Sequence, residues 1–138
     1  MAKVARIGVS LAGDLLEKFD LWVGEQGYPT RSEALKELIR QALIRKEWAG
    51  RGAVAGAVTF VYDHHRSGLT NRLVTLQHDF QEVVVSVQHV HLDHHNCLEV
   101  IVVKGDAKRI QALVARIKSV KGVKRSELVT MTTGRELP

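Results

Sequence analysis

The stretch VVVSVQHVHLDHHNCLEVIVV, residues 83–103, decides how the second half of this chain folds. Two runs rich in β-branched residues flank the polar segment 93–96, a pattern that predicts a β-hairpin. Side chains of a strand alternate between its two faces, so the imidazoles of His89 and His91 project from the same face, about 6.6 Å apart at the backbone. The hairpin therefore places two possible metal ligands side by side.

The number of residues in the turn decides where the thiol of Cys97 lies. A connection of three or five residues pairs Cys97 with His91 and puts its sulfur on the imidazole face, whereas two or four residues would turn it to the other face. We expect the odd number. The same register pairs Glu99 with His89, where the carboxylate can orient a ligand imidazole without binding the metal itself.

Histidine is concentrated around this hairpin. All seven histidines lie between residues 64 and 95, and the only cysteine is Cys97. His89, His91 and Cys97 leave a four-coordinate site one ligand short, and His78, near the end of a predicted helix, is expected to supply the fourth from the same chain or a neighbouring one. Imidazole and thiolate suit several late transition metals: a planar shell favours Ni(II) or Cu(II), and a tetrahedral shell favours Zn(II).

The segments around the hairpin complete a domain. Hydrophobic periodicity predicts, in chain order, a strand at 57–62, a helix at 69–80, strands at 83–92 and 98–103, a helix at 106–120 and a strand at 123–132. This β-α-β-β-α-β order is the ferredoxin-like arrangement, and such domains resemble ACT-type regulatory domains. Basic residues gather on or just after the second helix: Lys108, Arg109, Arg116, Lys118 and Lys121.

A glycine-rich segment divides the chain. Residues 49–56, AGRGAVAG, contain three glycines and predict a linker. It separates an amino-terminal domain, residues 1–48, from the ferredoxin-like domain, residues 57–138. We therefore expect an α+β protein of two small domains.

The amino-terminal domain begins with a strand pattern. Apolar residues alternate with Arg6, Gly8 and Ser10 within residues 4–11, which predicts a strand with one buried face. A single strand leaves both of its edges without hydrogen-bonding partners. We expect two chains to pair these strands antiparallel in a two-fold dimer.

Two helices follow the strand. Asp14 is the expected N-cap of the first helix, residues 27–29 end it, and Thr30 with Glu33 has the form of a capping box for the second. This strand-helix-helix unit, with RSEA at residues 31–34, resembles the ribbon-helix-helix family of DNA-binding repressors.

The ribbon-helix-helix resemblance implies how the protein would contact DNA. The two-stranded ribbon would enter the major groove of a two-fold symmetric operator, where Arg6 can read guanine. Gly8 departs from the polar residue usual in the family, so DNA shape or bridging water would substitute for direct readout there. The expected contacts are Arg6, Gly8 and Ser10 to the bases, and Thr30, Arg31 and Ser32 at a helix amino terminus to a phosphate.

Taken together, the two domains resemble the NikR family of nickel-responsive transcriptional regulators over essentially the whole chain. The motifs are Gln77-His78, His89-Val90-His91, five intervening residues and Cys97-Leu98-Glu99. The resemblance implies one square-planar Ni²⁺ per subunit, bound by His89, His91 and Cys97 of one subunit and His78 of another. It also implies a homotetramer, a dimer of dimers in which the metal-binding domains form the core.

The resemblance implies regulation by linkage. Nickel would favour the conformation that binds operator DNA, and the output would be repression of nickel uptake genes when nickel is sufficient. Arg66 would add a phosphate contact. An auxiliary cation site is expected at Glu33 and Glu37, with weaker metal contacts from Asp63, His64 and His65.

Two other functions share features with this sequence. A repressor that senses another transition metal or a small organic ligand is the alternative, because ACT-type domains bind amino acids. A metallohydrolase needs an open coordination position and a general base, and the sequence has no H-E-x-x-H motif, so we do not expect an enzyme. The single cysteine excludes an intramolecular disulfide framework and no segment reads as a signal peptide or membrane span, which favours the cytoplasm.

Overall fold

The computed structural model describes residues 3–138, which fold as two compact units, residues up to 40 and residues 41–138. The first unit contains α1 (Gly13–Glu25) and the beginning of α2 (Arg31–Ala49). Gly27, with φ of +74°, lies between them in the left-handed region that few other residues adopt, and the Tyr28 amide donates to the carbonyl of Val23 at 3.1 Å. This turn ends α1 where the sequence predicted.

The strand expected at residues 4–11 is not formed in the single chain. Residues 3–12 carry no regular secondary structure, and their apolar side chains are exposed, with Val4 at 86% and Ile7 at 77%. The physical reason is the one that led us to expect a dimer: a lone strand has no partner for its backbone hydrogen bonds. The strand is expected in a dimer, so it stays a prediction for the paired chains.

The helix caps follow the prediction in one case out of two. The N-cap of α1 is Ala12, and Asp14 lies in the first turn, where its carboxylate accepts a hydrogen bond from the Leu15 amide. At α2, the hydroxyl of Thr30 accepts from the Glu33 amide at 3.1 Å, as the capping box predicts. The Glu33 carboxylate pairs with Lys36.

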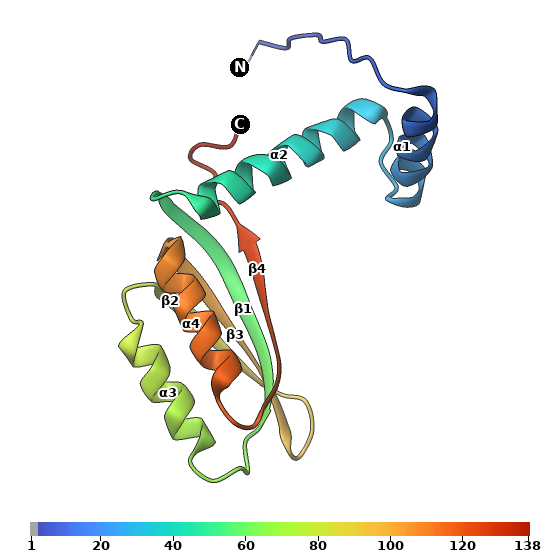
Figure 1. Cartoon of the computed structure of the whole chain (residues 1–138). Coiled ribbons are helices and arrows are strands. Elements are labelled where there is room, and N and C mark those ends of the chain that lie inside the picture. The colour runs from blue at the N-terminus through green and yellow to red at the C-terminus, as the bar shows by residue number, and fades with distance from the viewer. Residues whose placement is uncertain (1–2) are drawn as a thin grey trace. The chain divides into compact units, whose positions relative to one another are not determined.

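The second unit has the predicted β-α-β-β-α-β order (Figure 1). Its sheet has the strand order β2-β3-β1-β4 and all its pairings are antiparallel. The elements are β1 (Ala53–Asp63), α3 (Leu69–Asp79), β2 (Val84–His91), β3 (Asn96–Asp106), α4 (Ala107–Ser119) and β4 (Val123–Met131).

The expected linker is shorter than the glycines indicate. Residues 53–56 belong to β1, so only residues 50–52 connect α2 to the sheet. Gly56 allows a close approach: a Cβ there would lie 2.6 Å from the carbonyl oxygen of Val129 and 3.2 Å from the Trp48 ring. The Trp48 indole donates to the Met131 carbonyl at 2.8 Å. This glycine therefore serves packing rather than a hinge.

The core of the second unit lies between one face of the sheet and the two helices α3 and α4. Alternate residues of β1 and β3 are buried on that face, and they pack against the apolar stripe of α4. The opposite face of the sheet has no helix over it and exposes large apolar side chains, among them Val102, Val129 and Met131. No helix within residues 3–138 is long and apolar enough to cross a membrane.

Candidate metal centre

The hairpin register is the one that places the thiol beside the imidazoles. Cys97 pairs with His91 and Glu99 pairs with His89, with five residues between His91 and Cys97. The Cys97 sulfur lies 3.4 Å from His91 Nδ1. The prediction of an odd connection is confirmed, and with it the shared face of these side chains.

A single carboxylate organises the turn of the hairpin. One oxygen of Asp93 accepts from the backbone amides of His95 at 2.8 Å and Asn96 at 2.7 Å, and both of its oxygens accept from the Asn96 side chain. These hydrogen bonds, first that of the Asn96 side chain, lower the pKa of Asp93 to about 2. The turn is thereby fixed at the length that sets the register.

The thiol of Cys97 is fully buried. Burial raises its pKa, and the negative charges of Glu99, Asp93 and Asp63 raise it further. A metal ion would oppose all of these effects, because a coordinating thiol loses its proton. The donor set of imidazoles and one thiolate fits a late transition metal such as nickel.

The structure brings a third ligand atom to this pair from an unexpected position. Atoms of His64, His91 and Cys97 lie within 4.8 Å of one another, and His64 Nδ1 is 3.2 Å from the sulfur. The His64 amide donates to the His95 carbonyl at 3.0 Å, which holds the end of β1 against the hairpin. We expected His64 only as a weaker metal contact. The register between β1 and β3, which the sequence does not reveal, brings it here.

His89 contacts a tyrosine that sequence reasoning missed. Its Nδ1 lies 3.4 Å from the hydroxyl of Tyr62, and that hydroxyl donates to Glu99 at 3.0 Å. With its proton directed to Glu99, the hydroxyl can accept from His89 Nδ1–H, which leaves Nε2 free to bind a metal. Glu99 therefore acts on His89 through Tyr62, whose pKa is raised by burial and by the Glu99 carboxylate.

His78 lies apart from these ligands in the single chain. Its neighbour Gln77 donates to Glu99 at 2.7 Å, so Gln77 is turned toward the sheet while the side chain of His78 is exposed on α3. Within residues 3–138, the one group of three ligand atoms contains neither His78 nor His89. Both histidines are exposed, which leaves them open to a second chain.

The side chains predicted to contact DNA have varied surroundings. Arg6, Gly8 and Ser10 are exposed in the irregular segment. Thr30 and Ser32 are also exposed, at the start of α2. The Arg31 guanidinium forms a two-bond pair with Asp20, both contacts at 2.7 Å, and this pairing holds the pKa of Asp20 below its usual value. Arg66 packs over Gly122, where a Cβ would lie 2.7 Å from its Cδ.

The residues expected at an auxiliary cation site are distributed over both units. Glu33 and Glu37 are half-buried on α2. Asp63 accepts from the backbone amide of His65 at 2.9 Å, and His65 Nε2 lies 2.8 Å from the His94 carbonyl oxygen.

Comparisons with known proteins find relatives over nearly the whole chain. Residues 55–131 match the family model described as the NikR C-terminal nickel-binding domain. A protein of Thermococcus onnurineus named as a nickel-responsive regulator is 51% identical over 136 residues, covering 98% of this chain and 99% of its own. One of Chlorobaculum tepidum with the same name is 52% identical over 128 residues, covering 93% and 96%. An uncharacterized protein of Thermotoga maritima shares the fold, with a TM-score of 0.53 and 21% identity over 58% of this chain and 99% of its own.

Proposed function

Because the chain belongs to the NikR family of nickel-responsive regulators, it is a nickel-dependent transcriptional regulator and not an enzyme, and we propose that it represses nickel uptake genes when nickel is sufficient. Such a protein needs a selective metal site, a surface that reads DNA and a coupling between them. The metal site and the DNA-reading surface have support among the described residues. We place the protein in the cytoplasm, where its DNA would lie.

The proposed nickel site takes His89, His91 and Cys97 from one chain and His78 from another, with one ion per chain. The shared face of the first three side chains and the exposure of His78 support this set. Bound nickel would supply a fixed charge that holds the two chains together at this point. The residues of the chain orient the ligands: Tyr62 directs His89, and Glu99 accepts from both Tyr62 and Gln77.

The proposed DNA-binding domain, residues 1–48, is a dimer. Among residues 3–40 of the single chain, only Val23 and Ala34 are buried, while the apolar side chains of residues 4–11 and several of both helices are exposed. Pairing two copies of residues 4–11 would cover that surface and place Arg6, Gly8 and Ser10 on the outer face of a ribbon. Backbone amides at residues 30–32, and Arg66, would add phosphate contacts.

The proposed assembly is a homotetramer formed as a dimer of dimers, with residues 57–138 at its core. The uncovered face of the sheet supports this, because Val102, Val129 and Met131 are exposed there, side by side with other apolar residues. Exposed apolar patches of this kind mark interfaces between proteins. An auxiliary cation site at Glu33, Glu37, Asp63, His64 and His65 remains part of the proposal.

The observation that carries the proposal is the pairing of Cys97 with His91 beside His89. The test is X-ray absorption on nickel-loaded protein together with operator binding at low nickel. We expect a planar shell of three nitrogens and one sulfur, and nickel-dependent operator binding that Cys97→Ala abolishes. Arg6→Ala is the matched control: it should keep the nickel shell and lose operator preference.

Two results would contradict the proposal. A tetrahedral zinc shell in the metal-loaded protein would favour a sensor of another metal. Nickel-dependent operator binding that persists in Cys97→Ala at low nickel would separate the DNA response from this site.

A further inference from the structure

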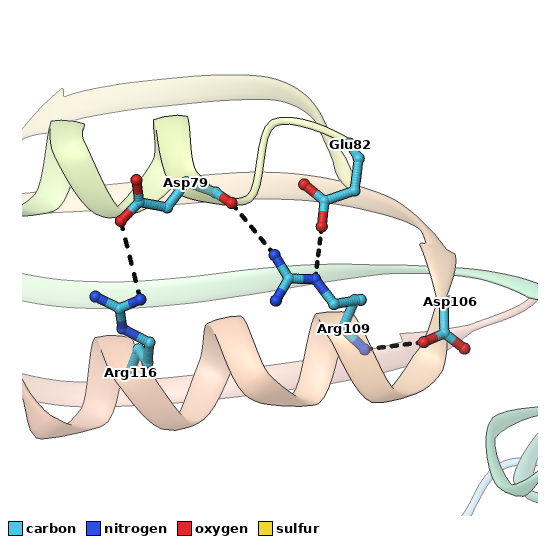
Figure 2. Close-up of polar contacts among 5 residues, drawn as sticks. All are labelled: Asp79, Glu82, Asp106, Arg109 and Arg116. Carbon is cyan, nitrogen blue, oxygen red and sulfur yellow. Dashed lines mark hydrogen bonds and ion pairs between the residues drawn. The ribbon is translucent and has the colours of Figure 1, made fainter.

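The basic cluster of α4 has no part in the proposed metal-binding or DNA-binding contacts. Two of its members, Arg109 and Arg116, are turned toward the carboxyl end of α3 (Figure 2). That end carries His78. We propose that Arg109 is a positioning residue for nickel binding: it fixes the end of α3 and thereby the direction from which His78 reaches the metal. This inference rests on the proposed function, in which His78 is a ligand.

Arg109 makes three different contacts with the segment that follows His78. Its Nε lies 2.6 Å from Glu82 Oε1, its Nη2 donates to the Asp79 carbonyl at 3.2 Å, and its guanidinium carbon lies 4.1 Å from the centroid of the Phe80 ring. A guanidinium is planar and carries several donors, so one group can stack and donate at the same time. Lysine could not make these contacts together.

The place of these contacts matters for the helix end. The last carbonyls of a helix have no partner within the helix and carry partial negative charge. Arg109 donates to the carbonyl of Asp79, the residue directly after His78, and Arg116 lies 3.9 Å from the Asp79 carboxylate. The two arginines of α4 thus provide partners for the carbonyl and the carboxylate of Asp79, in the last turn of α3 that also carries His78.

Arg109 is itself held by the core. The carboxylate of Asp106 accepts from the Arg109 amide at 3.3 Å and caps α4. The inner face of α4, including Ile110 and Leu113, is fully buried. The position of Arg109 is therefore set by the packed layer of the domain rather than by the α3 turn.

His78 is in this way bracketed by two anchors. On one side Gln77 donates to Glu99, and on the other Phe80, 2% exposed, lies in the core beneath Arg109. The imidazole of His78 is exposed between them. Fixing both neighbours limits the directions in which an exposed ligand can point, and such preorganisation raises metal affinity.

The ion pair between Arg109 and Glu82 is exposed, which distinguishes a positioning role of Arg109 from a role in global stability. The side chains of Arg109 and Glu82 are 45% and 50% exposed, and exposed pairs contribute little to global stability. Loss of the guanidinium should therefore disturb the α3 turn more than the folding of the domain.

The experiment is a double-mutant cycle in the full-length protein, with nickel affinity measured by chelator competition. Arg109→Gln should weaken nickel binding about tenfold in the wild-type background, the lower end of the range for residues that orient ligands. In the His78→Ala background it should have no further effect. Lys108→Gln, an exposed cation on the same helix, is the matched control and should leave affinity unchanged.

The outcomes separate this inference from the proposed function. Equal affinity of Arg109→Gln and wild type, or the same tenfold loss in the His78→Ala background, overturns the positioning role. Absence of the planar nickel spectrum in wild type overturns the proposed function instead. Circular dichroism of the apo-protein checks folding. If Arg109→Gln does not fold, Glu82→Gln replaces it in the double-mutant cycle. Equal affinity to wild type, or the same loss in the His78→Ala background, then overturns the positioning role.

Discussion

At the scale of single residues, two histidines compete for the place beside Cys97 and His91. His64 is within 3.2 Å of the sulfur in the single chain, whereas His89 is held by Tyr62 on the same sheet face. Burial of His64, followed by electrostatic repulsion from His65 and His91, lowers its pKa, which favours the neutral imidazole. A neutral imidazole can bind a metal, so chemistry alone does not separate the two.

Substitution separates these two histidines. In the proposed assembly His89 binds nickel and His64 does not, so His89→Ala should lower nickel affinity by more than about 100-fold, because loss of a ligand exceeds the effect of a residue that only orients one. His64→Ala is the matched control and should keep the planar absorption spectrum. Chelator competition and absorption spectroscopy measure both. The reverse pattern would assign the site to His64, His91 and Cys97.

A second prediction concerns the glycine under Trp48. In Gly56→Ala the new methyl group would meet the Val129 carbonyl oxygen at 2.6 Å, so the strands or the indole must shift. We expect a loss of about 1–3 kcal/mol in the free energy of unfolding, typical of overpacked sites. Gly52→Ala, where a Cβ meets nothing within 4 Å, should change it by less than about 0.5 kcal/mol. Urea titration of the apo-proteins measures both, and equal effects would refute the packing role of Gly56.

At the scale of elements, α1 and α2 of the first unit are joined by one ion pair and little burial. The guanidinium of Arg31 donates to both carboxylate oxygens of Asp20, and within residues 3–40 only Val23 and Ala34 are buried. The rings of Phe19 and Trp22 stack, and the Tyr28 ring packs against Trp22 at a tilt. Most of the apolar surface of this helix pair is thus left for a second copy to cover.

This ion pair predicts a pH dependence. Hydrogen bonds from Arg31 lower the pKa of Asp20, so the ionised carboxylate stabilises the folded state. That contribution is complete above the usual aspartate pKa, near 3.9, and is lost as the pH falls through the lower value of the folded protein. When the pH is lowered from 5 to about 2, the melting temperature of Asp20→Asn should therefore fall less than that of wild type. Arg31→Gln should show the same flattening in thermal melts, and an unchanged wild-type slope in either variant would contradict the pairing.

The elements also show how far the sequence leads. Periodicity predicted the β-α-β-β-α-β order, and strand parity predicted the pairing of Cys97 with His91, because both depend on local spacing. The approach of His64 and Tyr62 to the centre depends on the register between β1 and β3, which are distant in sequence. The glycine-rich composition predicts that Gly56 belongs to a linker. Its packing role depends instead on Trp48 and Val129, which lie outside its own segment.

At the scale of the whole molecule, the uncovered face of the sheet is the apolar surface available for contact with other chains. Alternation along the strands puts the core on one face and leaves Val102, Val129 and Met131 exposed on the other. The pairing of Ala57 with both Val102 and Val129 places these side chains on adjacent strands of one face. Covering such a surface is favourable in proportion to its apolar area.

Adjacent residues of β4 allow a matched test of this interface. Val129 lies on the uncovered face and Thr130, also exposed, lies on the opposite one. Val129→Asp should convert the proposed tetramer to a smaller species, since burying an unpaired carboxylate in an interface is costly. Thr130→Asp should leave the oligomer intact. Light scattering measures the mass, and a tetramer that survives Val129→Asp would exclude this face as the contact.

The two tryptophans of the chain provide an optical consequence of the fold. Trp48 is 7% exposed, and its indole donates a hydrogen bond to the carbonyl of Met131 at the end of β4. Trp22 is half-buried between the rings of Phe19 and Tyr28 in the first unit. Each unit therefore contains its own natural fluorophore. Tryptophan fluorescence of a Trp22→Phe protein would report on the end of the sheet, and that of a Trp48→Phe protein on the helix pair. Titrations with nickel or DNA could therefore be followed separately in each unit without an attached dye.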